Sequence, residues 1–432
     1  MALTTDPRLQ NQLIYSVYVR AHTNEGTFNA VTDDLPRIRA LGADYIWFLP
    51  IHPIGEKGKK GSLGCPYANR DYRGVNPAYG TLADFKHLCD AIHEYGMKVM
   101  IDVVYHHTSP DSVLWETHPE FFYRRADGSP GNRVGDWTDV IDLDYGVPEL
   151  WDYQIETLVQ WSALVDGFRC DVASFVPTAF WARARAAVEK RHPGFVWLAE
   201  TVHREFGAER RASGLYAATD GDAYSAFDIE YDYDTRTAFE RAVRGEAPLS
   251  RWTDLLEYQE AAYPANYNKL RFLENHDVPR IASLVTGGSD LVNYTAMLYF
   301  LKGTTLLYAG QEWANTRTPS LFEREPIDRA AGCDLTPLLK TLRGVKRDLL
   351  APDDVFFARA LDDSRVAVMR RSNARSDKYG VFSLASRAVS VELDAPDGSY
   401  VNRIDGSRVT VQGGSLRCDG RPVIFAVPRR AP

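Results

Sequence analysis

The chain contains few cysteines, and they follow no pattern that would indicate a disulfide framework or a zinc site. Its 432 residues include five, which are widely separated and form no CxxC pair: Cys65, Cys89, Cys170, Cys333 and Cys418. An odd number with this spacing favours reduced thiols. The opening residues MALTTDPRLQNQ also lack the basic and apolar regions of a signal peptide. Both observations predict a cytoplasmic protein.

A long apolar run and an excess of positive charge are missing as well. No stretch of about 18 apolar residues occurs, so the sequence predicts no membrane-spanning helix and no membrane partner. There are 50 lysines and arginines against 58 aspartates and glutamates, a formal net charge of −8. Binding to a phosphate backbone requires clustered positive charge, so no nucleic-acid partner is expected. A neutral substrate fits better, and the oligomeric state stays open.

The sequence does contain the material for a large buried core. Hydrophobic residues make up 45% and charged residues 25%, as in ordinary globular proteins. A single core usually stops growing at about 250–300 residues, so one large domain and a smaller one are expected.

Short apolar runs alternate with helix-like stretches through the first three quarters of the chain. In the segment 148–165, Trp151, Ile155, Leu158 and Val159 form one helical stripe, which is expected to pack on a sheet. The pattern favours a parallel (β/α)8 barrel, with a doubly wound sheet as the alternative. The predicted strands are 14–19, 45–49, 99–104, 167–172, 195–199, a weaker candidate at 223–229, 270–273 and 304–308.

The pattern changes at two places and thereby predicts domain limits. The polar and aromatic stretch 105–147 is far longer than the usual strand-to-helix loop of about 2–6 residues, so it is a separate excursion. From about residue 353, short alternating runs separated by Asp-Gly and Gly-Gly turns predict an antiparallel β-sandwich. The predicted segments are 1–104 and 148–351 for the barrel, 105–147 for the excursion and 352–432 for the sandwich.

Polar residues follow the predicted strands at the end where a parallel barrel carries its active site. They are Asp102 and His107, Arg169 and Asp171, Glu200, and the run Asn275-His276-Asp277. Each one alone is better explained by a surface or helix-capping role. Because four strand ends share the feature, the sequence predicts that these groups meet at one mouth of the barrel.

Two of these carboxyl groups suit the two steps of glycoside hydrolysis. Arg169 and Asp171 share one face of a strand, and the arginine would keep Asp171 ionised as a nucleophile, although a structural ion pair is the alternative. Glu200 follows an apolar run, where burial would keep it protonated as a general acid. A third, Asp277, could stabilise positive charge on the sugar, or simply end a strand in an Asx turn.

With these residues in place, the chain resembles the α-amylase superfamily, glycoside hydrolase family thirteen, over essentially its whole length. The four short family motifs occur in order at 102–107, 167–171, 197–200 and 272–277. The resemblance implies a barrel with an inserted domain B and a C-terminal domain C. It also implies a retaining enzyme acting on starch-like or maltooligosaccharide α-1,4-glucosidic bonds.

The resemblance carries roles over position by position. It implies that Asp171 is the nucleophile, Glu200 the acid/base and Asp277 the transition-state stabiliser. The implied substrate-binding residues are the stacking Tyr67, Asp102, His107, Arg169 and His276. An aromatic face such as that of Tyr67 suits the apolar face of a pyranose.

Three departures from the family pattern bear on metal binding and specificity. His106 stands where the family has a calcium-binding asparagine, and Ser174-Phe175 replaces a Lys-His pair that includes a second ligand. We therefore expect no metal ligands at the usual interdomain calcium position, and no cofactor. A shifted ion site among Asp136, Asp139 and Asp144 is the alternative, and Asp144 also ends a motif linked to specificity.

Two other functions remain open from the sequence. If the acceptor were a sugar and not water, the same residues would catalyse transglycosylation, as in a 4-α-glucanotransferase. A non-catalytic glucan-binding protein is a second alternative, because fold does not determine function. It is disfavoured because Asp171, Glu200 and Asp277 are all present.

Overall fold

The computed structural model describes residues 4–285 and 287–429, and eight of its strands form a closed parallel barrel. Around the barrel the order is β1-β10-β9-β8-β7-β6-β3-β2. This confirms the predicted (β/α)8 barrel and excludes the doubly wound sheet. The barrel strands are β1 (Leu13–Val17), β2 (Tyr45–Phe48), β3 (Lys98–Val103), β6 (Gly167–Cys170), β7 (Val196–Ala199), β8 (Ile229–Tyr231), β9 (Lys269–Arg271) and β10 (Thr304–Tyr308).

The weaker strand candidate at 223–229 was wrong except at its last residue. Its first part belongs to a helical turn, α8 (Asp220–Ala223), and the strand β8 begins only at Ile229. The turn is set by a capping box in which Thr219 and Asp222 satisfy each other's backbone N–H groups. Apolar residues continue from this turn into the strand, so hydrophobicity alone did not mark the boundary.

The longer helices are α2 (Phe28–Ala40), α3 (Leu82–Glu94), α5 (Pro148–Trp161), α6 (Thr178–Glu189), α7 (Arg204–Ala212), α9 (Tyr233–Val243), α10 (Ser250–Ala262), α12 (Gly288–Phe300) and α13 (Thr336–Leu349). Shorter helical turns are η2 (Pro7–Asn11), α1 (Val19–His22), α4 (Val113–Thr117), η3 (Pro119–Phe121), η4 (Ala173–Phe175), α11 (Ile281–Leu284) and η5 (Gln311–Trp313).

Helix α5 forms where expected, but its buried face differs from the predicted stripe. Leu158 is buried, whereas Trp151 is only half-buried and packs edge-to-face on Phe180 of α6. The fully buried positions include the polar Gln154 and Thr157. The apolar residues alone therefore predicted the wrong buried face, because one of them, Trp151, packs on the neighbouring helix α6.

The chain forms two compact units. The first holds Ile14–Tyr231 and Pro319–Ile327, and the second holds Asp6–Leu13, Asp232–Thr318 and the residues from Asp328 onward. Within the first unit, strand register places Asp102 of β3 beside Arg169 of β6, and Arg169 beside Leu198 of β7. Within the second, β9 pairs in parallel with β10.

The long stretch 105–147 carries little regular structure of its own. Its two short strands, β4 (His107–Thr108) and β5 (Ile141–Asp142), pair antiparallel, so the two ends of the excursion are joined next to the barrel. The bounds of the four predicted segments remain a prediction, and the outermost residues of the first and last segments lie outside the described part of the chain.

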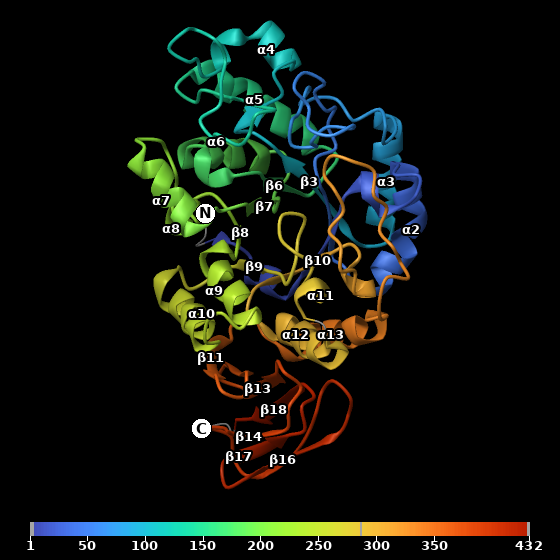
Figure 1. Ribbon diagram of the computed structural model, residues 1–432, viewed down its shortest axis with the longest axis vertical. Coiled ribbons are helices and arrows are strands. Elements are labelled where there is room, and N and C mark those ends of the chain that lie inside the picture. Colours follow the sequence, from blue (N-terminus) through green and yellow to red (C-terminus); the bar gives the residue numbers. More distant parts are fainter. Residues whose placement is uncertain (1–3, 286, 430–432) are drawn as a thin grey trace. The chain divides into compact units, whose positions relative to one another are not determined.

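The C-terminal region of the second unit consists of two antiparallel sheets, shown in orange to red in Figure 1. One has the order β11-β12-β13-β18 and the other β14-β17-β16-β15. A core that includes Val366, Val381, Val391 and Phe425 fills the space between them, which confirms the predicted sandwich. Its strands are β11 (Val355–Leu361), β12 (Val366–Ser372), β13 (Ser376–Ser383), β14 (Val389–Glu392), β15 (Gly398–Val401), β16 (Arg408–Gln412), β17 (Ser415–Cys418) and β18 (Val423–Pro428).

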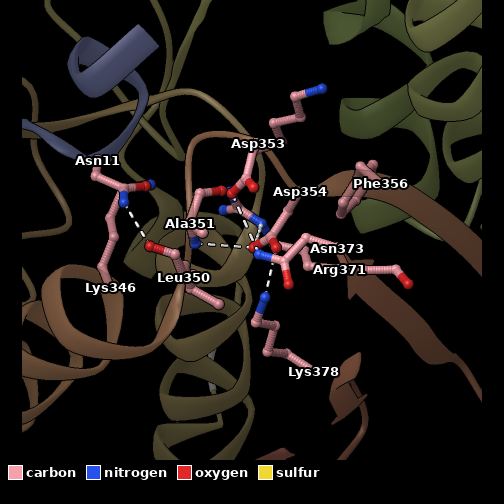
Figure 2. Close-up of polar contacts among 12 residues, drawn as sticks. Asn11, Lys346, Leu350, Ala351, Asp353, Asp354, Phe356, Arg371, Asn373 and Lys378 are labelled. Carbon is pink, nitrogen blue, oxygen red and sulfur yellow. Dashed lines mark hydrogen bonds and ion pairs between the residues drawn. The ribbon is translucent and has the colours of Figure 1, made fainter. Parts of the chain in front are cut away.

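A buried ionic cluster fixes the connection from α13 into β11 within the second unit (Figure 2). Asp354 is 1% exposed, and its carboxylate lies 2.5 Å from Nζ of Lys378 and 3.3 Å from Nε of Arg371. The same carboxylate accepts a hydrogen bond from the backbone N–H of Ala351. Removing Asp354 would leave two buried cations without their shared anion, so this connection is expected to be rigid.

Among the described residues, none of the helices is both long enough and apolar enough to cross a membrane.

Candidate active site

Arg169 is the centre of the polar cluster in the first unit. Its guanidinium is fully buried, and Nη1 lies 2.9 Å from Oδ1 of Asp102 and 2.8 Å from Oδ1 of Asp171. Nη2 lies 2.9 Å from Oε2 of Glu200. Burial alone would lower the pKa of Arg169, but the carboxylates of Asp102 and Glu200 raise it well above its usual value. The cation is therefore permanent, and it holds three carboxyl groups around one point.

The backbone brings Asp171 and Glu200 to the same edge of the sheet. The N–H of Asp171 donates to the carbonyl of Val103 at the end of β3, and the N–H of Glu200 donates to the carbonyl of Cys170 at the end of β6. Both residues thus stand one position past their strands, at the carboxyl ends where barrel enzymes carry their chemistry. Their exposures of 6% and 8% leave each carboxyl group only a small opening.

The surroundings of Glu200 are more polar than its apolar strand suggests. Oε2 accepts a 2.7 Å hydrogen bond from the backbone N–H of Val172 and faces the guanidinium of Arg169. Burial, which the apolar strand indicates, favours a neutral acid. The structure adds a backbone donor and a cation, both of which favour a charge on this oxygen.

Of two further predicted residues, Tyr67 contacts the same cluster and His107 contacts His106. The hydroxyl of Tyr67 donates to Oδ2 of Asp102 at 2.9 Å, and the guanidinium of Arg169 lies 5.6 Å from the centre of its ring. His107 is buried, with its Nδ1 atom 3.1 Å from that of His106. Burial lowers the pKa of His107 to about 4, against the raising effect of nearby Asp142 and Asp139. The imidazole is therefore neutral near pH 7 and able to exchange hydrogen bonds with a hydroxyl group.

His276 and Asp277 lie in the second unit, just after β9. Nε2 of the buried His276 is 3.0 Å from Oδ2 of Asp277, whose side chain is 38% exposed. Asn275 shapes this turn, because its Oδ1 accepts hydrogen bonds from the N–H groups of Asp277 and Val278. An Asx turn is thus present, and it coexists with an accessible carboxylate at Asp277.

A buried ion pair closes the loop that carries Asp277. Oε1 of Glu274 lies 2.6 Å from Nη1 of Arg280, and Oε2 accepts from the N–H of Ile281. The guanidinium of Arg280 also stacks 4.2 Å from the ring centre of Tyr308. These contacts fix both ends of the segment 274–281 within the second unit.

The residues at the family's usual calcium position do not fit a calcium ion. The ring of His106 packs against those of Phe175 and Trp137, at centroid distances of 5.6 and 5.9 Å. Burial and then the neighbouring His107 lower the pKa of His106 well below its usual value, so its nitrogens are neutral. An imidazole among aromatic rings is a poor ligand for a hard cation that requires about six to eight oxygen atoms.

A carboxylate at this position, that of Asp142, has its Oδ1 3.8 Å from Nδ1 of His106 and is held by arginine. Oδ2 of the fully buried Asp142 accepts from the backbone N–H of Arg133 at 2.8 Å and from its Nε at 3.2 Å. A second guanidinium, that of Arg210, stacks 4.0 Å from the ring centre of Phe175. Asp139 of the alternative ion site pairs with Lys60 at 3.1 Å. In the described part of the chain, no group of three or more His, Cys, Asp or Glu residues could hold a metal ion.

Three residues of the site were not found from the sequence. Trp47 of β2 and Tyr231 of β8 pack edge-to-face on each other, and each has its ring centre 5.3 Å from the guanidinium carbon of Arg169. The period of two along the strands could have indicated both. The third is Val172, whose backbone N–H contacts Glu200, and no side-chain pattern reports such a donor.

The fold and the cluster together define the class of protein. A closed (β/α)8 barrel with two carboxyl groups and an arginine at the carboxyl ends of adjacent strands is a barrel enzyme, with its reacting groups on the strand-to-helix side. The chain belongs to the α-amylase family: residues 13–127 and 134–349 match the α-amylase catalytic domain, and residues 357–425 match the bacterial α-amylase C-terminal domain.

Two solved structures are similar over nearly the whole chain. An α-amylase from Lactobacillus plantarum is 44% identical, with a TM-score of 0.94, 98% of this chain and 100% of that chain covered. A noncanonic maltogenic α-amylase, AmyB from Thermotoga neapolitana, is 30% identical, with a TM-score of 0.87 and the same coverage of both chains.

The curated relatives are longer proteins, and the chain spans less than half of each. α-Amylase MalA of Haloarcula japonica is 28% identical over 319 residues, which are 70% of this chain and 44% of that protein. An α-1,4-glucan:maltose-1-phosphate maltosyltransferase of Pseudomonas aeruginosa is 34% identical over 204 residues, 42% of this chain and 31% of that protein. Relatives of both hydrolytic and transferring type are therefore similar to this chain.

Proposed function

We propose that the protein is a retaining α-glucan hydrolase that cleaves α-1,4-glucosidic bonds in starch-like polymers or maltooligosaccharides. The observation that carries the proposal is the position of Arg169, whose guanidinium lies within 3 Å of carboxylate oxygens of both Asp171 and Glu200. Two carboxyl groups beside one cation supply a nucleophile and a proton donor at one point. The similarity to two α-amylases over 98% of the chain supports the substrate class.

In the proposed reaction Asp171 attacks the anomeric carbon while Glu200 gives its proton to the departing glycosidic oxygen. The bond to that oxygen breaks as the bond to Asp171 forms, which leaves a covalent glucosyl ester and a free sugar hydroxyl. Glu200, now ionised, takes a proton from water, and the water oxygen displaces Asp171. The permanent charge of Arg169 keeps the nucleophile ionised in both steps.

Asp277 is proposed as the stabiliser of the oxocarbenium-like transition state. Its carboxylate is exposed and follows β9, a strand of the same closed barrel, with the buried His276 holding one oxygen. Tyr67, Asp102, His107 and His276 are proposed to bind the sugar whose bond is broken. The hydroxyl bond from Tyr67 to Asp102 supports a fixed orientation for the ring of Tyr67.

A transglycosylase is the second candidate, because the maltosyltransferase of Pseudomonas aeruginosa is 34% identical over its matched region. The two functions differ only in the acceptor that enters the second step. Incubation with pure maltotetraose and chromatography of early products separate them. We expect glucose, maltose and maltotriose without longer chains; oligosaccharides longer than maltotetraose would establish transfer as the main activity.

A panel of starch, pullulan, sucrose, trehalose and maltooligosaccharides tests the substrate class. The proposal requires turnover of the α-1,4-linked members, and failure to bind or turn over any of them would overturn it. Binding of maltooligosaccharides without turnover would favour the non-catalytic alternative. We also propose that calcium is not required and that the protein works in the cytoplasm; the latter rests on the number and spacing of its cysteines.

A further inference from the structure

Val172, the residue after the proposed nucleophile, has a backbone conformation that L-residues rarely adopt. Its φ and ψ angles are 35° and 45°, in the left-handed region. Four described residues other than glycine have positive φ, namely Val172, Ala314, Arg365 and Ser386, and Val172 alone among them is β-branched. A β-branched side chain at positive φ is strained, and such strain persists only where surrounding structure maintains it.

The surrounding structure holds Val172 from both its side chain and its backbone. The side chain is 7% exposed and packs in a cluster with Phe175 and Ala217, flanked by Trp137 and Phe206. Its carbonyl accepts a 2.8 Å hydrogen bond from the N–H of Phe175. The strain is therefore balanced by packing against the aromatic group beside the active site.

The left-handed turn sends the N–H of Val172 toward Glu200. The donor lies 2.7 Å from Oε2 and is aligned for a hydrogen bond. Nη2 of Arg169 is 2.9 Å from the same oxygen but is not aligned for one. Only the contact from Val172 is therefore a hydrogen bond. Its N–H belongs to the peptide group that links Asp171 to Val172.

We infer that Val172 is a positioning residue that sets the acid/base for catalysis through its strained backbone N–H. This inference rests on the proposed function, in which Glu200 donates the proton. A proton on Oε2 would point at an N–H donor and at a guanidinium, so the acidic proton resides on Oε1 in each cycle. The peptide group between Asp171 and Val172 is thus bonded to the nucleophile residue, and its N–H determines which oxygen of Glu200 carries the proton.

Several other charged and titratable groups act on Glu200 in the first unit. They are Arg169, which it faces, and the residues that surround Arg169, namely Asp102, Asp171, Tyr67 and Tyr231. All of these remain unchanged when only the backbone of residue 172 is altered, so a backbone change isolates the contribution of one N–H group.

The direct experiment replaces this N–H by an ester oxygen. Incorporation of 2-hydroxy-3-methylbutanoic acid at position 172 keeps the valine side chain and removes the donor. Loss of a donor to the carboxylate makes deprotonation of Glu200 harder, so the basic limb of kcat/KM should move up by about half to one pH unit, with lower kcat and little change in KM. The same ester at Val176, whose N–H donates to the carbonyl of Ala173, is the matched control and should leave the limb in place.

A pair of ordinary substitutions tests the strain independently. Val172→Ala and Val172→Gly both remove the packed side chain, but only glycine adopts positive φ without cost. The glycine variant should therefore have the higher Tm and, because its turn can relax away from Glu200, the lower kcat. The reverse order of either quantity would overturn the inference, as would an unmoved basic limb in the 172 ester.

Glu200→Gln, measured in parallel, separates this inference from the function on which it rests. If Glu200→Gln retains wild-type turnover, the proposed role of Glu200 is wrong. If Glu200→Gln is inactive but the ester at position 172 leaves the basic limb unmoved, the role of Glu200 stands and that of Val172 is wrong.

Discussion

Nη1 of Arg169 lies 2.8 Å from Oδ1 of Asp171, and both side chains are buried. A buried arginine is costly unless its donors are satisfied, and here Asp102, Asp171 and Glu200 surround it. The planar guanidinium reaches three carboxyl groups through two separate nitrogens, Nη1 and Nη2, whereas an ammonium group has only one nitrogen. This contact therefore links the stability of the barrel to the charge state of the proposed nucleophile.

Arg169→Lys is expected to reduce both stability and turnover. Because lysine keeps the charge but loses the fork, we expect a loss of about 2–4 kcal/mol in the free energy of unfolding. We also expect kcat/KM to fall by about 100-fold or more. Thermal unfolding and steady-state kinetics measure the two effects.

Arg185→Lys is the control, because Arg185 binds Asp228 through two 2.7 Å contacts and touches none of the proposed catalytic groups. It should lose stability while its folded fraction keeps wild-type kcat/KM. A folded Arg169→Lys enzyme with full activity would contradict the role given to Arg169.

Asp171→Asn, Glu200→Gln and Asp277→Asn should each fold and lose most turnover, by about 10³-fold or more on natural α-glucans. Since the three groups act in one transition state, the losses should be strongly non-additive in double variants. Circular dichroism establishes folding, and initial rates on maltotetraose give the losses. Asp166→Asn, at the start of β6 where the carboxylate accepts from Val99, is the control and should remain active. If one of these three variants folds and keeps near wild-type activity, the residue changed in it does not have the role assigned to it.

Much of the architecture could be predicted because it depends on side-chain periodicity. Seven of the eight barrel strands were located from short apolar runs, and the C-terminal sandwich from alternating runs between turns. The missed case, β8, is only three residues long and follows a capped turn. The turn before it begins at hydrogen bonds between Thr219 and Asp222, and hydrophobicity does not report those.

The active-site cluster was predictable in its residues but not in its contacts. The period of two placed Arg169 and Asp171 on one face, and they form an ion pair. The N–H of Val172 on Glu200 depends on a positive φ angle at a valine, which no propensity would indicate. Likewise, the ring of Trp137 packs on that of His106 although the two residues lie far apart in the excursion, and such contacts leave no local sequence pattern.

The sugar released first should have the α-configuration at its new reducing end. Asp171 is assigned as a nucleophile, and two successive inversions at the anomeric carbon restore the starting configuration. Proton NMR within the first minutes of hydrolysis, before mutarotation equilibrates the anomers, distinguishes the two outcomes. Early appearance of the β-anomer would mean that Asp171 activates water and that the covalent intermediate does not form.

The buried histidines should make the protein less stable as the pH falls from about 6.5 to 4. The pKa of His107 in the folded protein is about 4, below the value of about 6.5 in an unfolded chain. The unfolded state therefore binds more protons in this interval, and His107 alone should cost about 2 kcal/mol between pH 7 and pH 5. Burial lowers the pKa of His106 as well, so its contribution has the same sign.

Urea unfolding across this pH range tests the effect. His107→Asn should flatten the pH dependence of the unfolding free energy, and His87→Asn, which alters an exposed histidine on α3, should leave it unchanged. An identical slope in wild-type protein and His107→Asn would show that His107 is not held neutral by burial.

Chelation of calcium should change neither stability nor activity. At the position where the family binds calcium, the ring of His106 packs on Phe175 and Trp137, and Arg133 provides the counter-charge for Asp142. Two guanidinium groups near one carboxylate supply positive charge that a metal ion would otherwise bring. The observable consequences are a Tm and a kcat that are equal, within error, before and after treatment with EDTA, and no stoichiometric calcium in the purified protein.

The stability of the protein should depend on Arg133 at this same position. Arg133→Met keeps an unbranched apolar stem and removes the counter-charge from the buried Asp142, so we expect the free energy of unfolding to fall by about 3 kcal/mol. Added calcium should not restore the loss, because the aromatic neighbours supply no oxygen ligands. Arg125→Met, in the same excursion but on its exposed surface, is the control and should change the free energy by less than about 0.5 kcal/mol. Bound calcium whose removal lowers Tm and kcat, and whose binding is lost in Asp142→Ala, would show instead that a metal holds this position.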